Sequence, residues 1–271
     1  MAYKRILTVQ DISCVGQCST TVALPILSAC GHETCILPTA VLSTHTGGFG
    51  KPVVQHLAVD GMWQHWKEQG IDFDCILVGY LGSIAAIETV SRLVDEMLAP
   101  GGVAIVDPAM ADHGKLYSGF DSGYAKAMQK LCEKADIMLP NITEAAMMAG
   151  KEYAEDFDMA YIDDLLEKLP GKDVVLTGVG FSPKRTGAAV RRNGELTFFE
   201  TPKVGKSYSG TGDMFAACFA GSLMQGKSME EAASIACRFV LRAIEATEEN
   251  PAHWYGVKFE TALPWLINQL F

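Results

Sequence analysis

Short apolar runs of β type alternate with longer segments of helical periodicity along most of the chain. The helix predicted after the N-cap Ser83 carries Ile84, Ile87, Val90, Val94, Met97 and Leu98 on one face. Asn193-Gly194 lies between two β-type runs, which predicts a hairpin of residues 188–192 and 195–200. The other predicted strands are residues 4–10, 34–37, 75–79, 103–106, 136–139 and 173–177.

Strands separated by helices predict an α/β fold, a three-layer α-β-α sandwich with a mostly parallel central sheet and an edge hairpin. No repeat or long linker interrupts residues 1–271, so we expect a single domain. Ligands in such sheets bind at the carboxyl ends of the strands. We therefore expect functional residues at Asp11, after Leu37, and at Tyr80, Asp107, Asn141 and Thr177.

The formal net charge of -10 opposes non-specific binding to nucleic acid or to an anionic membrane. The first apolar stretch ends at Asp11, too early for a signal peptide, and no apolar run approaches the roughly 20 residues that span a bilayer. We therefore expect a cytoplasmic protein. The eight cysteines form no Cys-x-x-Cys pair and are interpreted as reduced, mostly buried side chains, with the role of Cys14 and Cys18 left open.

The most informative segment is Ser209-Gly210-Thr211-Gly212-Asp213, which opens a long predicted helix. Two glycines around a threonine allow a tight turn whose backbone N–H groups point the same way. The helix N-terminus adds partial positive charge, so turn and helix together can hold a transferring phosphoryl group. Asp213, in the first turn, can accept the proton of an attacking hydroxyl. A plain turn with a capping aspartate is the alternative, and the small, apolar continuation Met-Phe-Ala-Ala favours the catalytic interpretation.

This segment resembles the C-terminal signature of the ribokinase-like small-molecule kinases. In that resemblance Asp213 is the catalytic base beside the acceptor hydroxyl, and Gly210, Thr211 and Gly212 form the anion hole. Further segments resemble those of pyridoxal kinases in the same order, over residues 4–246. They are Val9-Gln10-Asp11-Ile12-Ser13, Leu42-Ser43-Thr44-His45-Thr46-Gly47, Gly79-Tyr80-Leu81-Gly82-Ser83, Asp107-Pro108-Ala109-Met110 and Pro140-Asn141-Ile142-Thr143-Glu144.

The resemblance implies an ATP-dependent kinase that phosphorylates the 5′-hydroxymethyl group of pyridoxal, pyridoxamine or pyridoxine in the salvage of pyridoxal 5′-phosphate. It also implies a homodimer, and it leaves a monovalent-cation requirement open. ATP brings several negative charges, so such a reaction needs Mg²⁺, for which the candidate ligands are Asp107, Asp112 and Glu144. The implied ATP contacts are Asp107, Asp112, Tyr117, Asn141, Glu144, Thr177, Gly178, Gly210 and Gly212.

On the acceptor side, the resemblance implies contacts from Asp11, Ser13, Thr46, Tyr80 and Asp213. The glycines of residues 47–50 predict a mobile flap that closes over the acceptor and excludes water. Many pyridoxal kinases have serine where this chain has Asp11. A carboxylate there can pair with the aminomethyl group of pyridoxamine, so we expect pyridoxamine to be accepted at least as well as pyridoxal.

Two alternatives within the same fold are a hydroxymethylpyrimidine kinase of thiamine synthesis and a sugar kinase. The paired-glycine and sugar-binding pattern typical of sugar kinases is not evident near the N-terminus. An alternative of another class is a non-catalytic vitamer-binding protein, which the intact Asp213 and its glycines disfavour. A dinucleotide-dependent oxidoreductase is disfavoured because the first strand is not followed by a three-glycine fingerprint.

Overall fold

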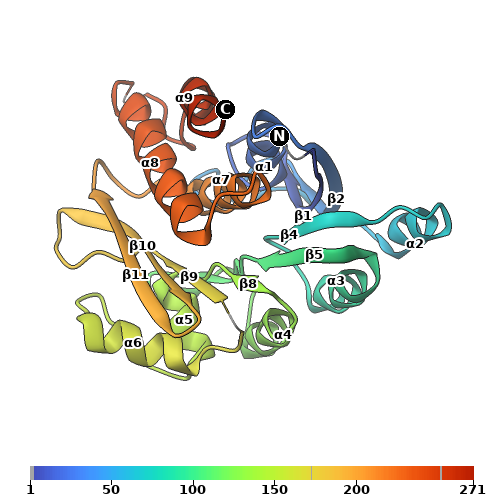
Figure 1. Ribbon diagram of the computed structural model, residues 1–271, viewed down its shortest axis with the longest axis horizontal. Coiled ribbons are helices and arrows are strands. Elements are labelled where there is room, and N and C mark those ends of the chain that lie inside the picture. Colours follow the sequence, from blue (N-terminus) through green and yellow to red (C-terminus); the bar gives the residue numbers. More distant parts are fainter. Residues whose placement is uncertain (1–2, 172, 251) are drawn as a thin grey trace.

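A twisted sheet runs through the middle of the molecule in the computed structural model, which describes residues 3–171, 173–250 and 252–271 (Figure 1). Residues 1, 2, 172 and 251 of the predicted domain lie outside the described residues. Within the described ranges, nine strands pair in the order β11-β10-β9-β8-β5-β4-β1-β2-β3. They are β1 Arg5–Ser13, β2 Glu33–Leu42, β3 Val54–His56, β4 Phe73–Val78, β5 Leu98–Val106, β8 Ile137–Met138, β9 Asp173–Thr177, β10 Arg185–Arg192 and β11 Glu195–Pro202.

The six strands from β9 to β2 are parallel, and antiparallel strands lie at both edges of the described sheet. One edge is the hairpin of β10 and β11, and the other is β3. A separate small hairpin joins β6 Ala111–Asp112 to β7 Lys115–Leu116. The mostly parallel sheet with an edge hairpin confirms the predicted fold class.

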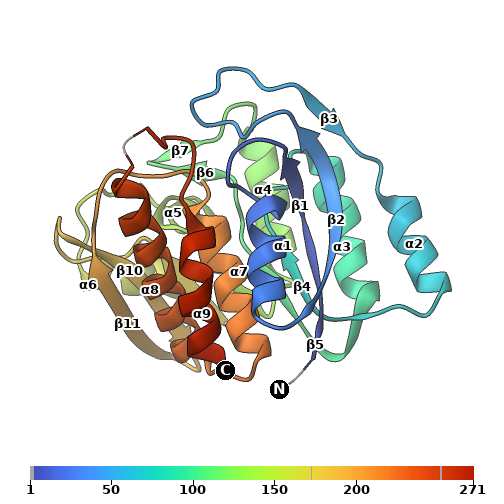
Figure 2. The ribbon, with the colours of Figure 1, turned by 90° about the horizontal axis from the view of Figure 1, so that it is seen from above.

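Helices cover both faces of the sheet (Figure 2). Each helix layer buries its own apolar cluster against the sheet. One layer holds α1 Thr20–Ala29, α7 Thr211–Met224, α8 Met229–Glu248, the short 3₁₀ helix η1 Phe259–Ala262 and α9 Leu263–Leu270. The other layer holds α2 Asp60–Glu68, α3 Ile84–Met97, α4 Ser122–Cys132, α5 Ile142–Met148 and α6 Met159–Lys168.

Helix α7 is apolar on nearly every side and is buried from Met214 to Ser222, between α1 and α8. A helix that is hydrophobic all round belongs in a core rather than on a surface. Its start is therefore held firmly relative to the carboxyl ends of the strands. Among the helices that the structure describes, none is both long and apolar enough to cross a membrane.

The local signals at three positions are confirmed. Ser83 caps α3, where its hydroxyl accepts a hydrogen bond from the N–H of Ala86 at 3.2 Å. Asn141 caps α5, where its side-chain oxygen accepts a hydrogen bond from the N–H of Glu144 at 3.0 Å. Asn193 and Gly194 have φ angles of 51° and 80°, the left-handed pair that a two-residue hairpin turn requires.

Other expectations were wrong in detail. The helix after Ser83 ends at Met97, and Leu98 begins β5 instead of continuing the apolar face. Ile84, also assigned to that face, is exposed. Strand β1 does not end at Gln10 but continues to Ser13, because Ser13 pairs with Leu42 of the equally extended β2.

Candidate active site

The start of α7 lies near the carboxyl end of β5, since a Cβ atom at Gly212 would stand 4.0 Å from Oδ2 of Asp107, the residue that follows β5. Gly210 is its N-cap, with φ 82° and ψ -2°, and offers no side-chain cap to the helix. A Cβ atom at Gly210 would lie 1.8 Å from the carbonyl oxygen of Gln17, so only glycine fits there. The N–H groups of the first helical turn have no intrahelical partner. They remain available to an anion in front of the helix.

Asp213 is part-exposed in that first turn, and its carboxylate accepts a hydrogen bond from the backbone N–H of Ser19. Removal from bulk water and the neighbouring Asp11 raise the pKa of Asp213, the Ser19 N–H opposes them, and the net result is a pKa of about 7. A carboxylate with a pKa near the working pH is well matched to take a proton from an alcohol.

Asp107 directly follows β5, where its N–H donates to the carbonyl of Val78 at 2.9 Å. Its Oδ2 lies 4.0 Å from the position that a Cβ atom would take at Gly212. Burial raises the pKa of Asp107 well above its ordinary value, and the nearby Glu144 and Asp213 add to the shift. Glu144 and Asp213 thus both lie close enough to Asp107 to interact with it electrostatically.

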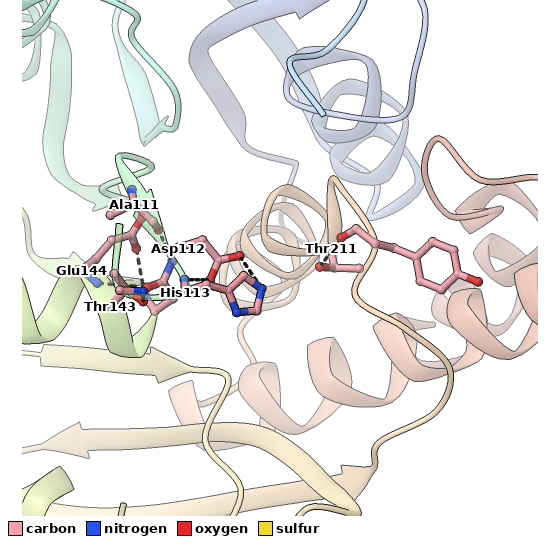
Figure 3. Close-up of polar contacts among 9 residues, drawn as sticks. Ala111, Asp112, His113, Thr143, Glu144 and Thr211 are labelled. Carbon is pink, nitrogen blue, oxygen red and sulfur yellow. Dashed lines mark hydrogen bonds and ion pairs between the residues drawn. The ribbon is translucent and has the colours of Figure 1, made fainter. Parts of the chain in front are cut away.

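Glu144 is almost fully buried at the start of α5. Its Oε2 accepts from the N–H of Asn141 at 2.8 Å, and its Oε1 accepts from Met110 and Ala111 at 3.1 and 3.4 Å. Burial raises the pKa of Glu144 to about 8, although these N–H groups favour the charged form. Glu144 therefore joins α5 to the segment that follows Asp107 (Figure 3).

The β6–β7 hairpin is tied to the same helix by two more hydrogen bonds. The Asn141 amide donates to the carbonyl of Ala111 at 2.8 Å, and the N–H of Gly114 donates to Oγ1 of Thr143 at 3.0 Å. Asp112 is exposed on this hairpin, where its Oδ1 accepts from the N–H of His113 at 2.8 Å and its Oδ2 lies 3.5 Å from Nε2 of the same residue's ring. Figure 3 shows that pair on the side of the hairpin toward Thr211.

The candidate magnesium ligands are only partly brought together. Glu144 raises the pKa of Asp107, and Asp112 raises that of Glu144 although Asp112 itself stands exposed on the hairpin. In the described ranges, no three His, Cys, Asp or Glu side chains are arranged to hold a metal ion. Mg²⁺ commonly takes one or two carboxylates and completes its shell with waters and phosphate oxygens. The part-exposed Asp107, beside a second buried acid, fits that mode of binding.

The remaining predicted nucleotide contacts surround this acidic centre. Thr177 ends β9 and bridges to Asn141 on the adjacent chain segment, and its N–H donates to the carbonyl of Pro140 at 2.8 Å. Gly178 follows with φ 78°. Tyr117 lies just after β7, where its N–H donates to the carbonyl of Met110 at 2.8 Å. The carboxyl ends of these strands and the β6–β7 hairpin therefore lie on the same side of the molecule.

On the acceptor side, Asp11 lies within β1, at a shift in the register between β1 and β2. Irregularities of this kind re-aim side chains near functional sites. The Asp11 carboxylate is 2% exposed and accepts hydrogen bonds from the hydroxyls of Ser13, at 2.9 Å, and Ser19. Tyr80 lies near enough that Asp11, together with burial, raises its pKa. Thr46 is exposed on the loop after β2.

Ser19 was missed by sequence reasoning. It is buried, adopts φ 54°, and contacts Asp11 through its hydroxyl and Asp213 through its N–H. A serine in the left-handed region is uncommon and cannot be recognised from residue types alone. Only the packing of residues 14–19 against the start of α7 reveals it.

Comparison with known proteins identifies the family of the chain. The model of the phosphomethylpyrimidine kinase family matches residues 27–257. The chain belongs to this family. All the site residues named above, apart from those of residues 11–19, lie within the match to the phosphomethylpyrimidine kinase family.

Individual relatives in this comparison carry two kinds of name. The crystal structure of pyridoxal kinase from Lactobacillus plantarum is 32% identical, with a TM-score of 0.90 over 98% of this chain and 97% of that one. Pyridoxal kinase PdxY of Rubrobacter xylanophilus is 28% identical over 89% of this chain and 87% of the relative. Hydroxymethylpyrimidine/phosphomethylpyrimidine kinase of Haemophilus influenzae is 27% identical over 62% of this chain and 63% of the relative.

Proposed function

We propose that this chain is an ATP-dependent kinase that phosphorylates the 5′-hydroxymethyl group of a B6 vitamer in the salvage of pyridoxal 5′-phosphate. The observation that carries the proposal is a carboxyl group with a pKa of about 7, Asp213, in the first turn of an uncapped helix that faces Asp107. Relatives of both names match nearly the whole chain, since a putative phosphomethylpyrimidine kinase from Bacteroides thetaiotaomicron is 33% identical and covers 98% of it. A second crystal form of that protein, 34% identical to this chain, was crystallised with pyridoxal, which supports a vitamer as the acceptor.

In the proposed reaction, Asp213 takes the proton of the acceptor hydroxyl while the oxygen of that hydroxyl bonds to the γ-phosphorus of ATP. The bond from that phosphorus to the β,γ-bridging oxygen breaks, and ADP leaves with the electron pair. The free N–H groups at the start of α7 stabilise the negative charge on the migrating phosphoryl group. Asp213 is then left protonated and returns its proton to water.

The nucleotide side of the proposal rests on Asp107, with Glu144 behind it, as the residues that would hold Mg²⁺. When bound with ATP, Mg²⁺ supplies positive charge that offsets the phosphate oxygens. Glu144 also fixes the β6–β7 hairpin, which presents Asp112 and Tyr117 to the same space. Thr177 and Gly178 would line the nucleotide from the neighbouring strand.

On the acceptor side, Ser13, Thr46 and Tyr80 would orient the pyridine ring. Asp11 is enclosed by two serine hydroxyls, so its charge would act on the acceptor and on Asp213 from beneath the site. The homodimer and the cytoplasmic location stay predictions, and a monovalent-cation requirement stays an open question.

The deciding experiment is an acceptor panel of pyridoxal, pyridoxamine, pyridoxine and hydroxymethylpyrimidine with Mg-ATP. The wild type should give its highest kcat/KM with a B6 vitamer, and Asp213→Ala should lose a factor of about 10² to 10⁴ in kcat. A preference for hydroxymethylpyrimidine would replace the proposed acceptor. Vitamer binding without turnover by the wild type would favour the carrier alternative, and full activity of the variant would refute Asp213 as the base.

A further inference from the structure

The connection between α8 and η1 contacts the loop of residues 43–50, which includes the flap predicted at residues 47–50. His45 is 4% exposed, and its Nε2 pairs with the carbonyl oxygen of Tyr255 at 2.9 Å. Its Nδ1 accepts from the N–H of Gly47 at 3.0 Å, so Nε2 carries the hydrogen and donates to Tyr255. We call residues 43–50 the acceptor loop and residues 253–256 the C-terminal brace.

Aromatic rings join the same two segments. The ring of Phe49 lies 4.7 Å from that of Trp254 and 5.8 Å from that of Tyr255, measured between centroids. A Cβ atom at Gly48 would stand 2.7 Å from the Trp254 indole, so the loop backbone rests directly on that ring. Trp254 itself is 46% exposed and therefore does not serve the core.

The C-terminal brace also bears on the turn that begins α7. The ring of His253 pairs through Nε2 with Oε1 of Gln17 at 2.8 Å. A Cβ atom at Gly256 would lie 2.8 Å from Cβ of Gln17, and the carbonyl of Gln17 packs against Gly210. The C-terminal brace thus contacts both the acceptor loop and Gln17, whose carbonyl packs against the start of α7.

The acceptor loop is closed on the site in this structure. A Cβ atom at Gly47 would stand 2.7 Å from Oγ of Ser209, the residue before Gly210. The acceptor loop is rich in glycine and has no helix or strand within residues 43–50, so ordering it costs conformational entropy. External contacts must offset that cost, and those described above come from the C-terminal brace.

We propose that Trp254 is a positioning residue for the acceptor: with the rest of the C-terminal brace, it holds the acceptor loop closed over the substrate. The inference rests on the proposed function. The C-terminal brace, which lies outside the strand ends and the glycine-rich turn, then contributes to acceptor affinity. It also helps to exclude water, the competing phosphoryl acceptor.

The test compares Trp254→Ala, Phe49→Ala and the double variant with pyridoxamine as the acceptor and Mg-ATP as the donor. Each single variant should raise the KM for pyridoxamine about 2- to 12-fold, the value of one aromatic pair, and leave the KM for ATP unchanged. The ratio of ADP formed to vitamer phosphorylated should rise above that of the wild type. The double variant should raise the KM by less than the product of the two single effects, because both substitutions remove the Phe49–Trp254 contact.

Trp265→Ala is the matched control. It removes the same residue type, from α9, where Trp265 packs against the guanidinium groups of Arg238 and Arg242. This variant should keep wild-type KM values and the wild-type ratio of ADP to product.

Three results would overturn the inference: an unchanged KM for pyridoxamine in Trp254→Ala, additive effects in the double variant, or an equal rise in the KM values of both substrates. If Trp254→Ala fails to fold, Phe49→Ala decides alone by the same constants. A wild type that phosphorylates no vitamer would refute the proposed function instead, so the two failures are distinguishable.

Discussion

Gly212→Ala separates the catalytic role of the helix start from its structural role. Gly212 is the second residue of α7, and its backbone is outside the left-handed region that would penalise a side chain. The nearest atom to a new Cβ is Oδ2 of Asp107, at 4.0 Å. That distance is an ordinary van der Waals contact, so the fold accommodates the methyl group without displacement.

The expected stability change is small and favourable. Alanine is preferred over glycine in a helix by about 0.5 to 1 kcal/mol, which raises the Tm of a chain of this size by roughly 1 to 4 °C. The expected activity change is large, because the methyl group fills the space between the helix start and Asp107. The proposal places the migrating phosphoryl group there, and losing one contact of an anion hole costs a factor of about 10² to 10³ in kcat.

The assay measures kcat with pyridoxamine and Mg-ATP, together with the Tm of each protein. Gly61→Ala is the matched control, since Gly61 is also the second residue of its helix, is also exposed, and has open space around its Cβ position. It should gain a similar Tm and keep wild-type kcat. If Gly212→Ala also keeps wild-type kcat at a raised Tm, no phosphoryl group passes between Gly212 and Asp107, and the mechanism is wrong.

The remaining predictions concern the base and its support. Gly210→Ala should lower both Tm and kcat, since the left-handed backbone costs about 1 to 2 kcal/mol with a side chain and the Cβ would collide with the Gln17 carbonyl; a variant with wild-type Tm would contradict this. The kcat/KM for the acceptor should fall about tenfold per pH unit below pH 7 and level off above it, because Asp213, raised to a pKa of about 7, must be deprotonated to act; a profile flat through pH 7 would count against Asp213 as the base. Asp11→Ser should lower the kcat/KM ratio of pyridoxamine to pyridoxal, and an unchanged ratio would remove Asp11 as a determinant of acceptor choice.

Sequence reasoning succeeded where the determinant is local. The alternation of strand and helix patterns predicted the six parallel strands and the edge hairpin in their order along the chain, and the caps of α3 and α5 follow from Ser83 and Asn141 and their immediate neighbours. It failed where the local signal is weak. Helix α2 buries only Trp63, and β3 is exposed at every residue, so neither shows the apolar period by which elements are recognised.

The candidate site also contains residues that a local pattern predicts and contacts that no local pattern predicts. Asp213, in the first turn after two glycines, was placed by residue type and spacing alone. Glu144 could be recognised as part of a capping box, but not that its other oxygen accepts from Met110 and Ala111, more than 30 residues earlier. Its link to the β6–β7 hairpin depends on how α5 and the end of β5 meet.

The amino-acid sequence by itself determined which residues form helix caps and turns and which segments carry an apolar face, because those preferences act between neighbours in the chain. Tertiary structure decided everything that requires distant segments to touch. The pairing of Ser13 with Leu42 placed Asp11 inside β1, and the contact of Gln17 with Gly210 set the helix start. The packing of Trp254 against the acceptor loop arose in the same way. No local pattern encodes such contacts, since their free energy depends on surfaces that meet only when the sheet and both helix layers assemble.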